Sequence, residues 1–207
     1  MIEIDYTKKG VIVYGSPRSG SHMTCDMLWR FSTVENKVYL GEITANELSR
    51  KNIQNLLTDL SAEYQNKFIF ASIVQLRIKN FLSQQPKLLK EYQLVHLRRR
   101  DKVKQYISWC MFRLQDNLGM WNHSPIWKDI LPYLPYQVTD DDLEQFILEH
   151  NIDYAFPKPD NIVYYEDLIQ MQLETNVKKN TYEWPMEKLV SNYQLVVDTF
   201  EDFKYHD

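Results

Sequence analysis

The sequence has little glycine and little cysteine, and it has no large excess of charge of either sign. Only 5 of its 207 residues are glycine and 2 are cysteine, while hydrophobic residues make up 44% and charged residues 25%. Such a composition excludes collagen-like, low-complexity and disordered chains. Because domains usually contain about 100–200 residues, the length predicts a single domain over residues 1–207.

Several functional classes lack their usual signals. Cys25 and Cys110 are far apart and form no CxxC or Cys/His spacing, so we expect neither a disulfide scaffold nor a metal site. No window approaches the roughly 18 consecutive apolar residues that a bilayer span needs. The N-terminus also lacks the apolar core of a signal peptide, so we expect a cytoplasmic protein without a membrane span.

The charge balance is slightly acidic. The 24 Lys and Arg residues against 28 Asp and Glu residues give a net charge of −4. Proteins that bind nucleic acid in general carry a basic excess, so we expect no nucleic-acid partner. A small anionic ligand needs only a local positive pocket and stays allowed.

The pattern along the chain alternates between strands and helical or polar connections. Short β-branched and aromatic runs predict strands, and apolar residues at helical spacing predict helices. The expected strands are Val11–Tyr14, Phe68–Ile73, Leu94–Leu97 and Asn161–Tyr165, and the expected helices follow Gly20, span Thr44–Leu60, begin near Asp101, and cover Thr139–His150 and Pro185–Tyr205. We interpret residues 36–42 as a polar connector and Leu118–Gln137 as an irregular binding loop or lid. The alternation predicts an α/β fold with a central parallel sheet of about four to five strands.

The first loop, Gly15-Ser-Pro-Arg-Ser-Gly20, lies between a predicted strand and a predicted helix. Backbone N–H groups and the helix N-terminus make an anion site in such a place. Its glycines match the P-loop pattern GxxxxGK[ST], but Ser21 and His22 stand where an ATPase has Lys and Ser or Thr. This favours an anion bound without a metal, and a plain strand–turn–helix is the alternative.

A second cationic element follows the third predicted strand. Residues 98–104 read Arg-Arg-Arg-Asp-Lys-Val-Lys and carry five cations against one anion. The carboxyl ends of parallel strands share one edge of a sheet, where ligands bind in open α/β folds. We therefore expect both loops to face one crevice, with a solvated charged surface as the alternative.

Together these elements resemble the paired nucleotide-binding signatures of sulfotransferases that use 3′-phosphoadenosine 5′-phosphosulfate (PAPS). Residues 99–109, with Arg100 eight positions before Ser108, are similar to the bacterial branch that sulfates trehalose and glycolipids, and Tyr165-Glu-Asp-Leu168 resembles a junction common in the family. The resemblance implies a three-layer P-loop-like fold and metal-independent transfer of a sulfuryl group to a hydroxyl of a small molecule or glycan. It also allows a homodimer. The donor ligands that it implies are Pro17, Arg18, Ser19, Gly20, Ser21, His22, Arg100 and Ser108.

The catalytic groups that follow are Arg18, which would stabilise the leaving phosphate, and Glu42, which would be the base. In the trehalose-sulfating branch the Glu of a Gly-Glu pair is the base, and Gly41-Glu42 is similar. A surface carboxylate is the plain interpretation of Glu42, and Glu35 and His22 are further candidates. His22 is itself a departure, because relatives usually have Thr there.

Two other functions stay open at this point. A P-loop kinase of unusual type would require magnesium, and the residues after Gly20 argue against it. A non-catalytic protein that keeps the nucleotide loops would bind the donor without turnover.

Overall fold

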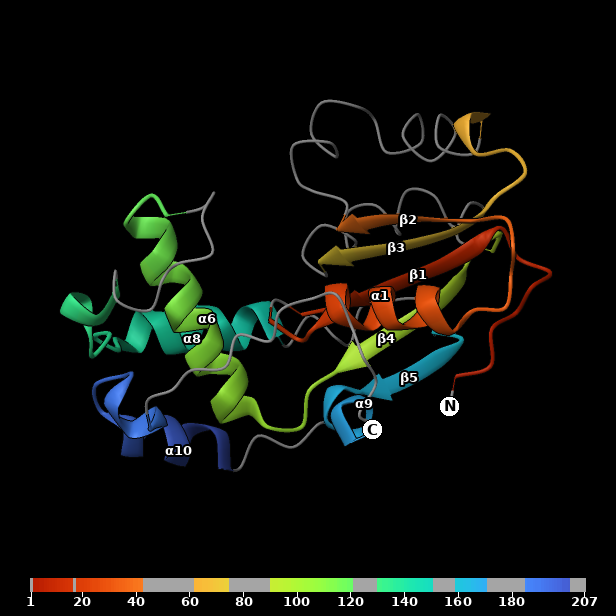
Figure 1. Cartoon of the computed structure of the whole chain (residues 1–207). Helices are drawn as coiled ribbons and strands as arrows, with labels where there is room; N and C mark the ends of the chain where they lie inside the picture. The colour runs from red at the N-terminus through yellow and green to blue at the C-terminus, as the bar shows by residue number, and fades with distance from the viewer. Residues whose placement is uncertain are drawn as a thin grey trace. The chain divides into compact units, whose positions relative to one another are not determined.

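A computed structural model describes residues 2–16, 18–42, 62–74, 90–120, 130–150, 159–170 and 185–201. The chain divides into two compact units (Figure 1). The first contains Met1–Arg100 and Glu149–Lys178, and the second contains Asp101–Leu148 and Lys179–Asp207. The single domain expected from the length stays a prediction.

The first unit is built on a five-stranded parallel sheet. Its strands are β1 (Gly10–Gly15), β2 (Lys37–Glu42), β3 (Phe68–Val74), β4 (Gln93–Arg98) and β5 (Asn161–Tyr164), in the order β2-β3-β1-β4-β5. Every neighbouring pair is parallel. With its flanking helices, the sheet confirms the expected α/β class and is compatible with a P-loop-like three-layer fold.

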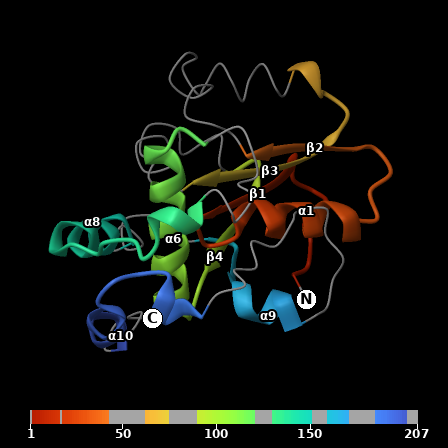
Figure 2. The ribbon, with the colours of Figure 1, turned by 60° about the vertical axis from the view of Figure 1, so that its left-hand side comes forward.

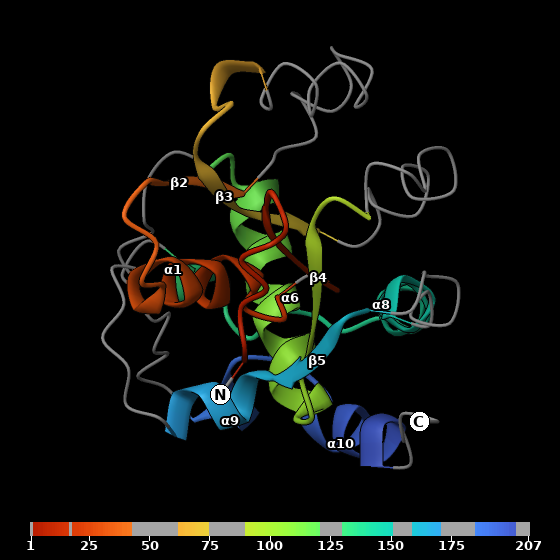
Figure 3. The same cartoon turned by 90° about the vertical axis from the view of Figure 1, so that its right-hand side faces the viewer.

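Helices α1 (Ser21–Phe31) and α9 (Tyr165–Gln170) lie on one face of this sheet (Figures 2 and 3). Alternate residues of the strands face these helices, as the period of two in a strand requires. One core cluster unites them: Val11, Val13, Met23, Cys25, Met27, Phe68, Phe70, Val95, Leu97 and Leu168. Burial of each large apolar side chain stabilises the fold by about 1.5–3 kcal/mol.

The opposite face of the sheet is also buried and carries a stacked aromatic pair. The rings of Tyr14 and His96 are 4.8 Å apart at 3° between planes, and these residues are neighbours in the β1–β4 pairing. His96 is 3% exposed. His96 therefore belongs to the core of the first unit.

Strand β1 is central, with β3 on one side and β4 on the other. The chain leaves β1 toward β2 and later returns to the other side of β1 with β4. The direction of the connections therefore reverses around β1. In open α/β sheets, ligands bind at the carboxyl ends of the strands at this reversal. The loop after Gly15 leaves from this position.

The connector expected over residues 36–42 is wrong in one respect, because Lys37–Glu42 is an edge strand. Its pairing with β3 is irregular, with a register shift between Tyr39 and Gly41. Most of its residues are only partly buried. An edge strand with one neighbour lacks the continuous apolar run of a central parallel strand, so its sequence resembles that of a polar connector.

The second unit holds α6 (Lys102–Asn117), most of α8 (Asp140–His150), α10 (Tyr193–Glu201) and two short 3₁₀ helices, Leu131–Tyr133 and Met186–Lys188. Helix α6 begins where the sequence predicts it, and Asp101 caps it, since the Asp101 carboxylate accepts a hydrogen bond from the Lys104 N–H at 2.8 Å. The core is aromatic: the rings of Tyr106 and Phe146 contact each other, and each also contacts Trp109 and Phe200.

The long helix expected over Pro185–Tyr205 is wrong within the described residues. After the 3₁₀ turn, Leu189–Ser191 run alongside Tyr136, with hydrogen bonds of 2.8 Å from Tyr136 N to Leu189 O and from Ser191 N to Tyr136 O. Asn192 then takes a left-handed conformation, with φ 53°. These tertiary bonds outweigh the helical periodicity. Within the described ranges, no helix has the length and apolar character to cross a membrane.

Candidate functional site

The loop between β1 and α1 is tightly folded around its glycines. A side chain on Gly15 would approach the Ser19 Oγ to 2.5 Å and the Leu97 carbonyl oxygen to 2.6 Å. Gly20 has φ 95°, and a Cβ there would lie 2.6 Å from the Tyr165 ring. Position 20 therefore requires glycine for both its conformation and its contact.

The loop opens α1 without a side-chain cap. Gly20 is the N-cap residue, and no side chain bonds to the first turn from that position. Arg18 is left-handed as well, with φ 61°, and the Ser19 N–H bonds to the Ser16 carbonyl at 3.1 Å. A helix start of this kind presents backbone N–H donors to an anion.

The Ser19 side chain of the loop is buried and, in the described part of the chain, has an unsatisfied hydroxyl. It is 1% exposed, and among the described residues its Oγ has no hydrogen-bond partner. A buried hydroxyl left without a partner costs about 1–3 kcal/mol. Ser19 therefore leaves one hydroxyl donor unused inside the described part of the loop.

The end of β4 is joined directly to this loop. Arg99 donates from Nη1 to the Arg18 carbonyl at 3.2 Å, and its guanidinium lies 4.8 Å from the centre of the Tyr165 ring. The Arg99 Nε is also 4.0 Å from a Glu166 carboxylate oxygen. The two elements expected to meet at the carboxyl edge of the sheet are therefore in contact.

Arg100 makes a different set of contacts. Both of its terminal nitrogens donate to the Asp167 carboxylate, at 3.0 Å for Nη2 to Oδ2. The guanidinium carbon lies 3.9 Å from the centre of the Tyr164 ring, and the Arg100 N–H donates to Glu166 at 3.1 Å. The Arg100 hydrogen bond lowers the pKa of Asp167. Sequence reasoning missed this partner, although it singled out the segment that contains it.

His22 and Glu42 lie at the same edge as the loop. The Tyr39 hydroxyl is 3.1 Å from the His22 Nε2 and 3.4 Å from the His22 carbonyl oxygen. Burial raises the pKa of Tyr39, so its hydroxyl stays protonated. The His22 Cε1 lies 3.5 Å from where a Cβ on Gly41 would be, and Glu42 follows as the exposed last residue of β2. The imidazole thus bridges the start of α1 and the end of β2.

Three expected ligands remain: Ser108 lies in the second unit, Pro17 lies outside the described residues, and Ser21 begins α1. Ser108 is 9% exposed and belongs to α6 of the second unit, so its expected place beside Arg100 stays a prediction. Pro17 lies outside the described residues. Ser21 is the first residue of α1 and is also 9% exposed.

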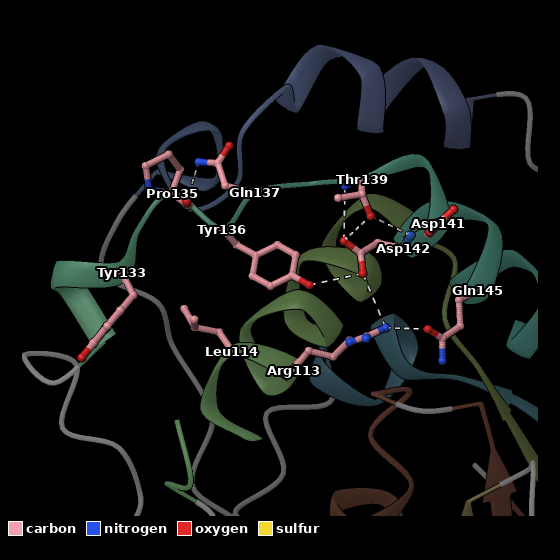
Figure 4. A pocket seen from close by; sticks show the side chains of 10 residues that line it. All are labelled: Arg113, Leu114, Tyr133, Pro135, Tyr136, Gln137, Thr139, Asp141, Asp142 and Gln145. Carbon is pink, nitrogen blue, oxygen red and sulfur yellow. Dashed lines mark hydrogen bonds and ion pairs between the residues drawn. The ribbon is translucent and has the colours of Figure 1, made fainter. Parts of the chain in front are cut away.

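The second unit has a pocket of its own, with a volume of about 630 Å³ (Figure 4). At its centre Asp142 accepts hydrogen bonds from the Tyr136 hydroxyl at 3.3 Å and from the Thr139 hydroxyl at 2.9 Å, and Arg113 lies 3.5 Å away. Burial, with the charge of Asp142, raises the pKa of Tyr136 to about 12. These contacts cap α8 and hold the segment before it in place. The polar groups of the pocket therefore have a structural role that needs no ligand.

Over the described ranges, no cluster of three or more His, Cys, Asp or Glu side chains could hold a metal. A scan of the chain against models of protein families finds no match, and a search of curated proteins finds none either.

Proposed function

We propose that the protein is a sulfotransferase that moves a sulfuryl group from PAPS to a hydroxyl acceptor without a metal. The observation that carries the proposal is the β1–α1 loop, which combines the start of an uncapped helix with the unpartnered buried hydroxyl of Ser19. Such a loop fits an anionic group of three or more oxygens. The resemblance of the sequence to the PAPS signatures supplies the identity of the nucleotide.

The residues after Gly20 favour this donor over magnesium-ATP. A P-loop ATPase uses a Lys to reach the phosphates and a Ser or Thr hydroxyl to hold Mg²⁺. Here Ser21 and His22 occupy those positions, and the His22 imidazole contacts Tyr39. The cation of the loop is instead Arg18, two residues before Gly20.

When bound, PAPS supplies an electrophilic sulfur and a phosphate leaving group. The loop amides, Ser19 and Arg18 would hold the 5′-phosphosulfate and stabilise the charge that develops on the departing phosphate oxygen. Hydrogen-bond donors that are fixed in place before the reaction often make the greatest single contribution to catalysis.

Glu42 would act as the general base. The acceptor oxygen forms its bond to sulfur as the bond from sulfur to the phosphate oxygen breaks, and the acceptor proton passes to the Glu42 carboxylate. The exposed position of Glu42 at the end of β2 leaves room for an acceptor. A well-placed base contributes about 10²–10⁴-fold.

The acceptor class rests on the resemblance alone, which implies a carbohydrate or glycolipid hydroxyl. The resemblance also implies that Arg100 and Ser108 hold the 3′-phosphate that distinguishes PAPS from ATP. Arg100 is half-exposed and within reach of solvent.

The proposal is tested by incubating the purified protein with PAPS, EDTA and a panel of sugars and glycolipids. Release of 3′-phosphoadenosine 5′-phosphate, matched by sulfate in one acceptor, is the expected result. Activity that appears only with magnesium and ATP would favour a kinase. Tight binding of the nucleotide without transfer to any acceptor would favour a non-catalytic binding protein.

A further inference from the structure

Two contacts of its side chain and one of its main chain fix Arg100 at the end of β4. Asp167 takes both terminal nitrogens of the guanidinium, the Tyr164 ring lies against its face, and Glu166 accepts a hydrogen bond from the Arg100 main chain. All three partners come from the β5–α9 junction, more than sixty residues away. The guanidinium therefore has a defined plane and orientation.

One edge of this guanidinium stays open. A carboxylate that binds Nη1 and Nη2 occupies the outer end of the fork and leaves the edge formed by Nε and one terminal nitrogen. In the part of the chain that the structure describes, the Arg100 Nε has no acceptor within hydrogen-bond distance. The side chains of Arg100 and Asp167 are 51% and 52% exposed. A ligand in solution can therefore reach the Arg100 side chain.

Arg99, the neighbour of Arg100, is much less exposed and has different contacts. The Arg99 side chain is 14% exposed, donates to the Arg18 carbonyl and lies over Tyr165. These contacts give Arg99 the role of joining two loops. Of the two arginines, Arg100 has the accessible donors, and Asp167 determines the direction in which they point.

We propose that Asp167 is a positioning residue for phosphate recognition: it orients Arg100 so that the open Nε edge receives the 3′-phosphate of the donor. This rests on the proposed function, since it assumes a nucleotide with a 3′-phosphate. Asp167 acts through Arg100 and does not itself contact the nucleotide.

Whether removal of the Asp167 carboxylate weakens or tightens nucleotide binding distinguishes a positioning role from charge repulsion alone. A carboxylate near a phosphate repels it, so removal of the Asp167 charge would tighten binding if charge alone mattered. If Asp167 positions Arg100, its removal instead weakens binding, because the guanidinium loses its fixed orientation and the phosphate must order it.

The experiment is a calorimetric titration with two probes, 3′-phosphoadenosine 5′-phosphate and adenosine 5′-phosphate. For Asp167→Ala we expect the affinity for the first to fall about three- to tenfold and the affinity for the second to stay unchanged, since only the first has a group for Arg100. In an Arg100→Ala background, Asp167→Ala adds nothing further. Asp167→Glu, which keeps a carboxylate, recovers part of the loss.

Glu91→Ala is the matched control. It removes a carboxylate of similar exposure, 44%, from an ion pair with Lys9, just before the amino end of β4 and thus at the opposite edge of the sheet. It should leave both affinities unchanged. Suppose that the wild-type protein prefers the 3′-phosphate nucleotide and that Asp167→Ala binds this nucleotide equally well or more tightly. That result overturns the role of Asp167 and leaves the proposed donor in place. A wild-type protein that does not distinguish the two nucleotides overturns this role together with the proposed donor.

Discussion

Arg99 donates a hydrogen bond of 3.2 Å to the main-chain carbonyl of Arg18, across 81 residues of sequence. This contact ties the end of β4 to the loop after β1. Two segments that resemble separate parts of a donor site are thereby held together at one edge of the sheet. The carbonyl of Arg18, and with it the shape of the loop, depends on a side chain from another strand.

Arg99→Lys tests this link without changing the charge. Lys cannot reproduce the planar fork that bonds to the carbonyl while lying over Tyr165. We expect nucleotide affinity to fall about two- to tenfold, as loss of one hydrogen bond of about 0.5–1.5 kcal/mol implies. Arg30→Lys is the control, because Arg30 pairs with Asp26 within α1 and the same substitution there should leave affinity unchanged. An equal loss in both variants would contradict the role of Arg99.

Gly20→Ala should destabilise the protein more than Gly119→Ala. Both glycines have positive φ, at 95° and 68°, so both substitutions introduce strain of about 1 kcal/mol or more. Only at Gly20 would the new methyl also meet a ring, that of Tyr165 at 2.6 Å, while nothing lies within 4 Å at Gly119. Thermal unfolding should show a drop of a few degrees for Gly119→Ala and a clearly larger one for Gly20→Ala. Equal drops would mean that Tyr165 moves aside.

The sequence predicted the β1–loop–α1 unit well because its signals are local. An apolar strand, a loop bounded by glycines and a helix with periodic apolar residues need no distant partner. The start of α6 near Asp101 followed from an equally local pattern, and the parallel sheet followed from the alternation of strands and helices along the chain.

Other features depend on contacts that sequence patterns do not reveal. Strand β2 was missed because an edge strand with an irregular pairing at Tyr39 and Gly41 has a weak apolar pattern. The C-terminal helix was predicted too long because the bonds between Tyr136 and Leu189–Ser191 come from a remote segment. The pairing of Arg100 with Asp167, 67 residues away, has the same cause.

Glu42→Gln should slow the chemical step and leave donor binding intact. An amide cannot accept the proton of the acceptor, so transfer should fall about 10²–10⁴-fold, while the affinity for 3′-phosphoadenosine 5′-phosphate stays the same. Glu35→Gln tests the other candidate carboxylate, since Glu35 lies between α1 and β2. If transfer survives in Glu42→Gln and is lost in Glu35→Gln, the base has been misassigned.

Both thiols should be unreactive in the folded protein. Cys25 and Cys110 are 0% exposed. Burial raises the pKa of Cys110 to about 12 and raises that of Cys25 as well, so almost no thiolate exists near neutral pH. A thiol reagent such as DTNB should therefore titrate no cysteine in the native protein and 2 in guanidinium chloride. Rapid native reaction of either thiol would contradict its burial.

We propose above all that the β1–α1 loop and Arg100 bind a 3′-phosphorylated adenine nucleotide. The most direct measurement is a calorimetric titration of the metal-free protein with 3′-phosphoadenosine 5′-phosphate, in parallel with ATP and magnesium. We predict micromolar, metal-independent binding of the first and much weaker binding of the second. No binding of the 3′-phosphorylated nucleotide, or a preference for magnesium-ATP, would contradict the claim.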